Sequence, residues 1–475
     1  MRQEPGSYRD PRGQIYHQDG RLFRTVTEAG YQDFMDVAET GLLQSLINSN
    51  RLVAYDLVDP VDHGFDTSAK LLLEHSVLPY ISYPYEWGFN LLKSAAVMQL
   101  QIILESLEHG VMLSDASAYN IQFVGAKPIF IDHLSFRPYQ EGEYWIGHRQ
   151  FCEQFLNPLL LRSSLGIPHN SWYRGSLEGI TSVELNKLLP VYKKMGLNMF
   201  TQVHLQAHFQ TKSIKQTNEP TAKSKAIGER KLPKKSREQL ILSMLRWINK
   251  LQPKDQQSSI WSNYVSTKSY TDAANSQKGD IVSDYVTRTK SGSILDLGCN
   301  TGEYSEIALN AGATRVVAYD FDHGALDRAF DRAEKNSLNI LPLFLDATNP
   351  PPDQGWMQSE RQGFSQRANT DGLLALALIH HIVIGKNVPL ESCVQWLLSL
   401  ADHGLIEFVP KTDPMVQILL MNREDIFPQY TVEKFRSILS SKADVVSETK
   451  IIDSDRIIFE YSNILPSQAN DRTSN

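Results

Sequence analysis

The chain has 475 residues, of which 41% are hydrophobic, 21% charged and 9% aromatic. These proportions are typical of a globular protein and exclude a chain that is disordered or fibrous throughout. At about 150 residues per domain, the length predicts about three domains, or two large domains and a connector. The 47 basic and 54 acidic residues give a formal charge of −7, which excludes a globally basic nucleic-acid-binding protein.

Cysteine content and hydropathy indicate where such a chain works. Three cysteines (Cys152, Cys299 and Cys393) are too few and too scattered for a disulfide framework or a zinc site. The N-terminal residues lack the apolar core of a secretory signal. The longest apolar stretch, 373–384, is shorter than the about 20 residues that span a bilayer. We therefore expect a cytoplasmic protein with no membrane partner.

Residues 1–210 are expected to form an α+β domain that recognises the substrate. Apolar residues at helical or strand spacing, together with glycine turns, mark its elements. In chain order the expected elements are a β-hairpin over 12–28 turning at Asp19-Gly20, a helix over 30–50, two strands within 70–85, a helix over 90–109 ended by Gly110, and a small hairpin of 121–124 and 128–131 around Gly125.

A basic segment separates this domain from the rest of the chain. Residues 211–237 contain nine Lys or Arg and only two Glu, a net charge of +7, and are otherwise rich in Pro, Thr, Ser and Gln. Such a composition predicts a solvated linker, with a tether for RNA or another polyanion as the alternative. Residues 238–290 have a helical pattern and are expected to lead into a second domain.

The strongest chemical signal lies in the sequence SILDLGCNTGEY at 293–304. An apolar strand carries Asp296 near its end, and a turn containing Gly298, Asn300 and Gly302 then opens a helix. Glycines suit such a turn because a ligand cradled by bare backbone leaves no room for Cβ atoms. The spacing differs from the G-x-G-x-x-G of dinucleotide-binding folds, which argues against NAD.

Further strands are expected to complete an α/β, Rossmann-like domain over 291–465, followed by a disordered tail over 466–475. Asp320 ends the second strand, 24 residues after Asp296, where a carboxylate can accept both hydroxyls of a ribose. Asp346 ends the third strand. The expected strands after the first are 314–320, 340–346, 371–382 and 404–410, closed by an antiparallel hairpin over 443–461.

The pattern D-x-G-x-N-x-G resembles the first motif of class I S-adenosylmethionine (SAM) methyltransferases. The resemblance implies a SAM cofactor whose amino-acid part lies against Gly298 and Gly302, whose ammonium lies near Asp296, and whose adenine is contacted by Asp346. The phrases YPYEW, LLALALIHHI and EFVPKTDPMVQ also resemble a narrower group, methyltransferases similar to the nodulation protein NoeA. This likeness extends through the N-terminal half and does not name an acceptor.

Three residues are candidates for contact with the methyl acceptor. His380 and His381 follow the fourth expected strand, and Glu407 lies at the tip of the fifth, where this family places residues that face the substrate. Methyl transfer from a sulfonium depends mostly on alignment, so a base is needed only if the acceptor must lose a proton. The alternative for the histidine pair is a cap on the strand end. Tyr270 and Lys278, just before the domain, are candidates to cover the cofactor.

A second constellation lies in the N-terminal half. Asp115 and Asn120 form D-x-x-x-x-N, and Asp132 follows a short strand. The three residues resemble the catalytic loop and the magnesium-binding Asp of kinase-like phosphotransferases, which makes Asn120 and Asp132 an alternative magnesium site. No glycine-rich loop or VAIK-like lysine is visible, and only Lys70 could substitute. The alternative is that Asp115 and Asn120 make local turn hydrogen bonds.

The sequence thus predicts a SAM-dependent methyltransferase with an unidentified acceptor, small molecule or macromolecule. Two other functions stay open: a kinase-like phosphotransferase whose SAM domain is regulatory, and a non-catalytic scaffold that binds SAM. A nucleic-acid acceptor is possible but not favoured, because the net charge is negative and the Asn/Asp-Pro-Pro-Tyr motif of base-methylating enzymes is missing.

Overall fold

The computed structural model describes residues 1–65, 69–194, 196–208, 232–255, 271–421 and 423–463. The chain divides into two compact units. The first contains Met1–Asp255 and the inserted segment Asp353–Arg361, and the second contains Gln256–Pro352 and Gln362–Asn475. Most of the expected linker, and Tyr270 with the residues just before it, lie outside the described residues.

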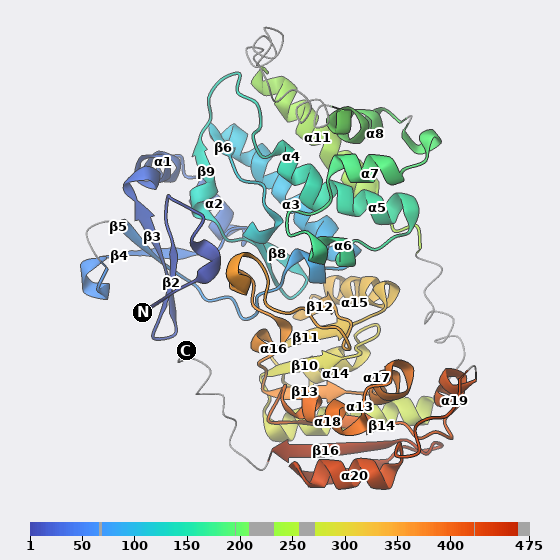
Figure 1. Cartoon of the computed structure of the whole chain (residues 1–475). Coiled ribbons are helices and arrows are strands. Elements are labelled where there is room, and N and C mark those ends of the chain that lie inside the picture. Colours follow the sequence, from blue (N-terminus) through green and yellow to red (C-terminus); the bar gives the residue numbers. More distant parts are fainter. Residues whose placement is uncertain (66–68, 195, 209–231, 256–270, 422, 464–475) are drawn as a thin grey trace. The chain divides into compact units, whose positions relative to one another are not determined.

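An antiparallel sheet of order β1-β2-β3-β5-β4 opens the first unit (Figure 1). The hairpin expected over 12–28 is confirmed, and Asp19 and Gly20 both adopt positive φ at its turn (51° and 76°). The five strands are β1 (Arg2–Gln3), β2 (Ile15–Gln18), β3 (Arg21–Thr27), β4 (Tyr55–Val58) and β5 (Ala69–His75).

Two expectations for this unit are wrong. The single helix expected over 30–50 is two helices, because Gly41 takes a φ of +77° between them. The second strand expected within 70–85 is instead an irregular segment that ends in the 3₁₀ turn Pro84–Glu86. Prolines interrupt the segment, and the backbone N–H and C=O of Ser82 are satisfied by the side chain of Gln122 at 2.9 and 3.1 Å rather than by a neighbouring strand.

The rest of the first unit is built on one long helix, α3, which lies where the helix over 90–109 was expected. Gly110 follows the helix with a φ of 70°, and Gly125 turns the β7–β8 hairpin, as predicted. Helix α11, which includes the last residues of the expected linker, packs on α3. The short strands are β6 (Val111–Leu113), β7 (Ile121–Val124), β8 (Lys127–Phe130) and β9 (Phe136–Pro138). The helices are α1 (Glu28–Glu39), α2 (Leu42–Asn48), α3 (Phe89–Glu108), α4 (His148–Phe151), α5 (Asn157–Leu165), α6 (Asn170–Gly175), α7 (Ser182–Leu188), α8 (Leu197–Met199) and α11 (Lys234–Lys250).

This order of elements confirms the α+β fold and is compatible with the kinase-like resemblance of the second constellation. A sheet with helix α1 after its third strand comes first, and the long helix α3 follows. The loop with Asp115 and Asn120 lies between β6 and β7, and Asp132 comes directly after the β7–β8 hairpin. The three residues of the second constellation therefore lie on loops that a helix and a hairpin hold in place.

The second unit has the expected Rossmann-like fold. Its sheet has the order β12-β11-β10-β13-β14-β16-β15, in which the first five strands are parallel and the closing hairpin of β15 and β16 is antiparallel. The five parallel strands are mostly apolar and buried, as in a sheet covered on both faces, whereas the edge strand β15 is largely polar and exposed. The strands are β10 (Ser293–Leu297), β11 (Arg315–Asp320), β12 (Ile340–Phe344), β13 (Gly372–Ala375), β14 (His403–Phe408), β15 (Ala443–Lys450) and β16 (Ile457–Asn463).

Helices connect and cover these strands (Figure 1), with α13 packed on α14 and α18 packed on α20. The strand expected over 371–382 is too long, because β13 ends at Ala375 and a helix starts at Ile379. A short apolar run does not by itself distinguish a buried strand from a buried helix. The helices are α13 (Asp272–Thr289), α14 (Glu303–Asn310), α15 (His323–Lys335), α16 (Phe364–Arg367), α17 (Ile379–Lys386), α18 (Leu390–Leu398), α19 (Pro414–Leu420) and α20 (Val432–Ser440).

The centre of this sheet requires a glycine at position 404. A Cβ atom there would lie 2.5 Å from the carbonyl oxygen of Leu373 on β13. We expect Gly404→Ala to lower the free energy of unfolding of the second unit by about 1–3 kcal/mol, because the two strands must separate locally. Gly385→Ala is the control, since a Cβ there would meet no atom closer than 4.0 Å. Urea denaturation followed by circular dichroism measures both, and equal effects would contradict the prediction.

The described residues also bear on the membrane and cysteine expectations. None of their helices combines the length and the hydropathy that crossing a bilayer requires. Cys152, Cys299 and Cys393 are all buried free thiols, as the scattered cysteines predicted.

Candidate active site

The glycine turn lies between the first strand of the second unit and the helix that follows. Gly298, Asn300 and Gly302 all have positive φ, at 82°, 50° and 77°. The backbone N–H groups of Gly298 and Cys299 donate to the carbonyl oxygen of Tyr319 on β11, at 2.8 and 3.0 Å. The turn is thereby fixed against the second strand, with its backbone curled at the carboxyl end of the sheet. This is the end at which open α/β sheets bind ligands.

Asp320 ends β11 beside this turn. Its Oδ2 accepts a hydrogen bond from the backbone N–H of Asn300 at 2.8 Å, and its Oδ1 accepts one from the N–H of Asp322 at 2.7 Å. Burial raises the pKa of Asp320 to about 6, although these backbone donors act in the opposite direction. The structure therefore brings Asn300 and Asp320 together and leaves the carboxylate able to accept further donors, while their contacts with a cofactor stay a prediction.

Asp346 lies on the neighbouring strand end. The residue before it, Leu345, donates its backbone N–H to the carbonyl oxygen of Asp320 at 3.0 Å. The Oδ1 of Asp346 accepts from the N–H and the hydroxyl of Thr348, at 3.0 and 2.7 Å. Asp320 and Asp346 thus occupy adjacent strand ends, and the adenine contact of Asp346 stays a prediction.

Asp296 has a more structural environment than the sequence suggests. It lies within β10 with 3% of its surface exposed, and its Oδ2 accepts the hydroxyl of Ser305 on α14 at 2.6 Å. Burial raises the pKa of Asp296 to about 7. The Asp296 side chain joins β10 to α14, the helix after the turn, and so helps to hold the turn between them in place.

The donors and acceptors of this edge fit SAM. The positive φ values at Gly298 and Gly302 give the ligand bare backbone to approach, and a Cβ at residue 298 would project towards Leu378 at 3.6 Å. The Asp320 carboxylate has the chemistry to accept ribose hydroxyls. Residues Gly298, Asn300, Gly302, Asp320 and Asp346 are therefore those that would hold the cofactor.

A buried network of four charged side chains lies beside α14, the helix that follows the glycine turn. Lys278 Nζ on α13 donates to Glu407 Oε2 on β14 at 2.8 Å, and both side chains are almost fully buried (2% and 0% exposed). Arg456 Nη1 lies 3.7 Å from Glu407 Oε1. The same guanidinium forms two hydrogen bonds to Asp413, at 2.6 and 3.0 Å. Two cations and two carboxylates thus balance one another inside the second unit.

Lys278 also connects this network of charges to the helix after the glycine turn and to the two histidines. Its ammonium lies 5.0 Å from the ring centre of Tyr304, the second residue of α14. Its charge acts on Asp296, where it lowers the pKa, and on His380, where it also lowers the pKa. Lys278 is therefore buried on α13 beside Tyr304 and Glu407, and its role in covering the cofactor stays a prediction.

His380 and His381 lie in the first turn of α17, in contact with each other at 4.0 Å between ring centres. Burial lowers the pKa of His380 well below its usual value, and that of His381 to about 4. Both imidazoles are therefore neutral at pH 7. They can accept a proton, whereas Glu407 is already engaged by Lys278.

Sequence reasoning missed Arg456 and Asp413 at this site. Asp413 belongs to the phrase EFVPKTDPMVQ, and Arg456 to the expected closing hairpin over 443–461, but neither was a candidate site residue. The only signal in the sequence was their position: Arg456 directly precedes an apolar strand, and Asp413 directly precedes Pro414. In the structure the Asp413 carboxylate caps α19 by accepting from the N–H of Met415 at 2.9 Å.

The three residues of the second constellation also meet in the structure. Asn120 Nδ2 lies 3.4 Å from Asp132 Oδ2. Burial, followed by the charge of Asp132, raises the pKa of Asp115. Lys70 does not join them, because it lies on β5 and pairs with Glu28 at 2.8 Å. The basic residue at this cluster is instead Arg24, which the sequence analysis did not single out.

Comparison with known proteins gives a relative that matches nearly the whole chain. The nodulation protein NoeA of Rhizobium meliloti (strain 1021) is 44% identical over 457 residues, which cover 96% of this chain and 95% of that protein. A family model described as FtsJ-like methyltransferase matches residues 278–354, the stretch from Lys278 past Asp346. The ribosomal protein L11 methyltransferase of Thermotoga maritima is 40% identical over 53 residues, covering 11% of this chain and 20% of that protein.

Solved structures give weaker matches. The bifunctional kinase-methyltransferase WbdD is 19% identical, with 39% of each chain covered and a TM-score of 0.28. The PH0226 protein of Pyrococcus horikoshii OT3 is 15% identical, with 41% of this chain and 95% of that chain covered and a TM-score of 0.30. At these scores the matches do not establish an activity for this chain.

Proposed function

Since the chain belongs to the family of the nodulation protein NoeA and carries a match to FtsJ-like methyltransferases, we propose that it is a SAM-dependent methyltransferase. The observation that carries this proposal is the glycine turn at 298–302, whose backbone is fixed against the Asp320 carboxylate at the carboxyl end of the sheet. The acceptor of the methyl group is either a small molecule or a macromolecule.

Each residue of the site has a task that its environment supports. Gly298, Asn300 and Gly302 hold the amino-acid part of the cofactor, Asp320 its ribose and Asp346 its adenine. Bound SAM would supply a methyl group on a sulfonium; the acceptor's nucleophilic atom would bond to that methyl carbon as the carbon–sulfur bond breaks and S-adenosylhomocysteine leaves. The chain's contribution is to hold the acceptor in position, since such a displacement depends on alignment.

His380 and His381 are the candidates for taking a proton from the acceptor, should its nucleophilic atom carry one. Both imidazoles are neutral, the form that accepts a proton, but their lowered pKa values make them weaker bases than a free histidine, so this role requires that the bound acceptor raise the pKa. Glu407 faces the acceptor side in the sequence pattern, but its ion pair with Lys278 makes it a positioning residue in this proposal.

The direct test is calorimetric titration of the full chain with SAM, with S-adenosylhomocysteine and with NAD. We expect both sulfur nucleosides to bind with one site per chain and NAD to give no heat, because the turn lacks the glycine spacing that a pyrophosphate requires. Absence of SAM and S-adenosylhomocysteine binding would overturn the proposal. Binding of SAM without methyl transfer to any acceptor fraction would instead support the non-catalytic scaffold.

A further inference from the structure

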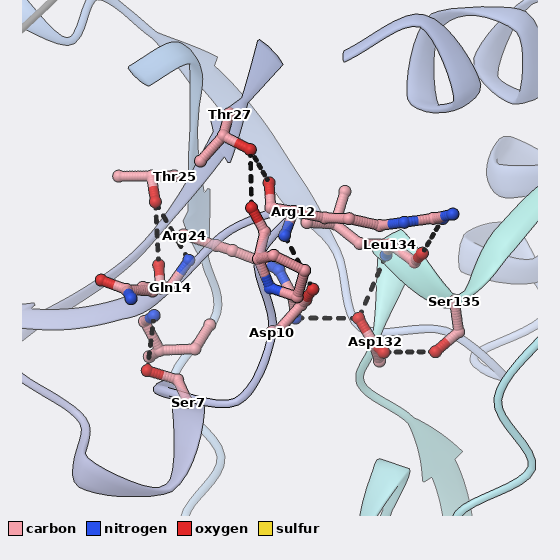
Figure 2. A network of polar contacts seen from close by, with 12 residues as sticks. Ser7, Asp10, Arg12, Gln14, Arg24, Thr25, Thr27, Asp132, Leu134 and Ser135 are labelled. Carbon is pink, nitrogen blue, oxygen red and sulfur yellow. Dashed lines mark hydrogen bonds and ion pairs between the residues drawn. The ribbon is translucent and has the colours of Figure 1, made fainter. Parts of the chain in front are cut away.

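A buried arginine lies at the centre of a polar network in the first unit (Figure 2). Arg24, on strand β3, is only 7% exposed. Its Nη1 contacts Asp132 Oδ1 at 2.9 Å, and its Nη2 donates to Asp10 Oδ2 at 2.6 Å. One guanidinium therefore joins the sheet to the loop before β2 and to the residue that the kinase-like resemblance assigns to a magnesium ion.

The oxygen atoms of Asp132 are already engaged by donors. Oδ1 accepts from Arg24 and from the backbone N–H of Leu134 at 3.1 Å. Oδ2 accepts from the Ser135 hydroxyl and from Asn120 Nδ2, the latter at 3.4 Å. A carboxylate offers about four lone-pair positions, so these four contacts use its capacity. The Nδ2 of Asn120 also donates to Ser135 Oγ at 3.3 Å. Of the two residues of the alternative magnesium site, Asp132 thus accepts hydrogen bonds with both oxygens, and Asn120 directs its N–H groups at Asp132 and Ser135.

The charges around Arg24 show that it is the compensating cation. Its two carboxylate partners are Asp10 and Asp132, and the charge of Asp132 acts in turn on Asp115. The histidines packed nearby, His75 and His133, stack with ring centres 4.9 Å apart, and burial lowers the pKa of both, that of His75 to about 4.

The neighbouring arginine is directed elsewhere. Arg12 Nη2 pairs with Asp33 at 3.2 Å, and Arg12 Nη1 donates to the carbonyl oxygen of Leu134 at 3.2 Å. Neither of these contacts reaches a carboxylate of the cluster. The positive charge that faces Asp132 is therefore the guanidinium of Arg24.

A magnesium ion does not fit this arrangement. It needs oxygen lone pairs in an octahedron at about 2.0–2.1 Å, and it is bound reluctantly without them. Here a guanidinium lies at hydrogen-bond distance from the carboxylate that would be the main ligand, and a dication beside it would be repelled. No group of three or more metal-binding side chains occurs elsewhere in the part of the chain that the structure describes.

We propose that Arg24 is the resident cation of the Asp115–Asn120–Asp132 cluster and keeps it free of divalent metal. The first unit then resembles a phosphotransferase in its order of elements but lacks the metal site, and the charge of Arg24 joins the sheet to the Asp132 loop. Loss of the guanidinium leaves Asp10 and Asp132 without the cation that pairs with them, which is the condition under which a divalent ion is attracted.

The test is titration of the full chain with Mn²⁺, followed by calorimetry and by electron paramagnetic resonance of free Mn²⁺. We expect wild-type and Asp132→Asn chains to bind Mn²⁺ alike, because Asp132 is not a ligand. Arg24→Met is expected to bind Mn²⁺ at least about tenfold more tightly, since one positive charge within a few ångströms is removed. The double variant Arg24→Met/Asp132→Asn is expected to lose that gain.

Two results would overturn the proposal. One is Mn²⁺ binding by the wild type that Asp132→Asn abolishes, and the other is a folded Arg24→Met chain with no gain in affinity. Circular dichroism reports whether Arg24→Met folds. Should it not fold, the comparison of wild type with Asp132→Asn decides by itself, because Asn is isosteric with Asp and can still accept from Arg24. Repeating that comparison with ATP and Mg²⁺ gives the same decision for a metal-bound nucleotide.

Discussion

Replacing Asp320 by Ala is expected to weaken SAM binding by about a hundredfold or more. A hydrogen bond to a charged group contributes about 1.5–3 kcal/mol, and the Asp320 carboxylate is placed to accept two from a ribose. Its contact with the N–H of Asn300 also fixes the glycine turn, so the variant loosens the turn as well. Calorimetric titration with SAM measures the effect.

Asp371→Ala is the matched control for this variant. Asp371 precedes the fourth strand, at the opposite end of the same sheet, where its Oδ2 accepts from the N–H of Ser293 at 2.8 Å. We expect its loss to leave the SAM affinity within about threefold of the wild type, because a substitution away from the binding edge costs little there. Equal losses in Asp320→Ala and Asp371→Ala would contradict the assignment of the ribose site.

The Asp320 carboxyl also predicts a pH dependence of SAM binding. Its pKa in the folded chain is about 6, above its ordinary value of 3.8, and hydroxyl donors favour the ionised form. We therefore expect SAM affinity to rise as pH increases from 5 to about 7 and then to level off, and the Asp320→Asn variant to lack this rise. Because the folded chain holds this proton to higher pH than the unfolded chain, the carboxyl's contribution to stability falls as pH rises from about 4 to 6.

Removing the carboxylate of Glu407 is expected to give the largest loss of stability. Glu407→Ala leaves the ammonium of Lys278, 2% exposed, without the carboxylate at 2.8 Å. Breaking a buried ion pair by removing one partner costs about 3–5 kcal/mol, because the other charge has lost its water and its partner. We expect methyl transfer to fall with it, since Lys278 lies beside Tyr304 and His380.

Glu448→Ala is the control for this effect. The pair of Glu448 with Arg436 lies in the same unit, but its side chains are 33% and 40% exposed. An exposed pair contributes about 0–1 kcal/mol. Urea denaturation, with the transition of the second unit followed by circular dichroism, compares the two. A Glu407→Ala chain no less stable than Glu448→Ala would contradict the prediction.

Local patterns in the sequence predicted the second unit well. Apolar runs bounded by glycines and ending in acids placed β10, β11 and β12, and the glycine spacing placed the turn beside Asp320. These features are encoded by neighbouring residues, because parallel strands put their carboxyl ends at one edge of the sheet whatever lies elsewhere. The runs could not show that His380 and His381 belong to a helix, since a buried strand and a buried helix are equally apolar.

The sequence by itself thus determined the Rossmann-like unit, its cofactor turn and the three polar residues of the N-terminal constellation. Only the tertiary structure decided which charges meet. Lys278 and Glu407 are 129 positions apart, Asp413 and Arg456 are 43 apart, and Arg24 reaches Asp132 from a different sheet. Charged residues occur throughout the chain, and no local pattern distinguishes an exposed one from a buried one. Packing of distant strands and helices removes water from a few of them, and each of these then requires a partner of opposite charge.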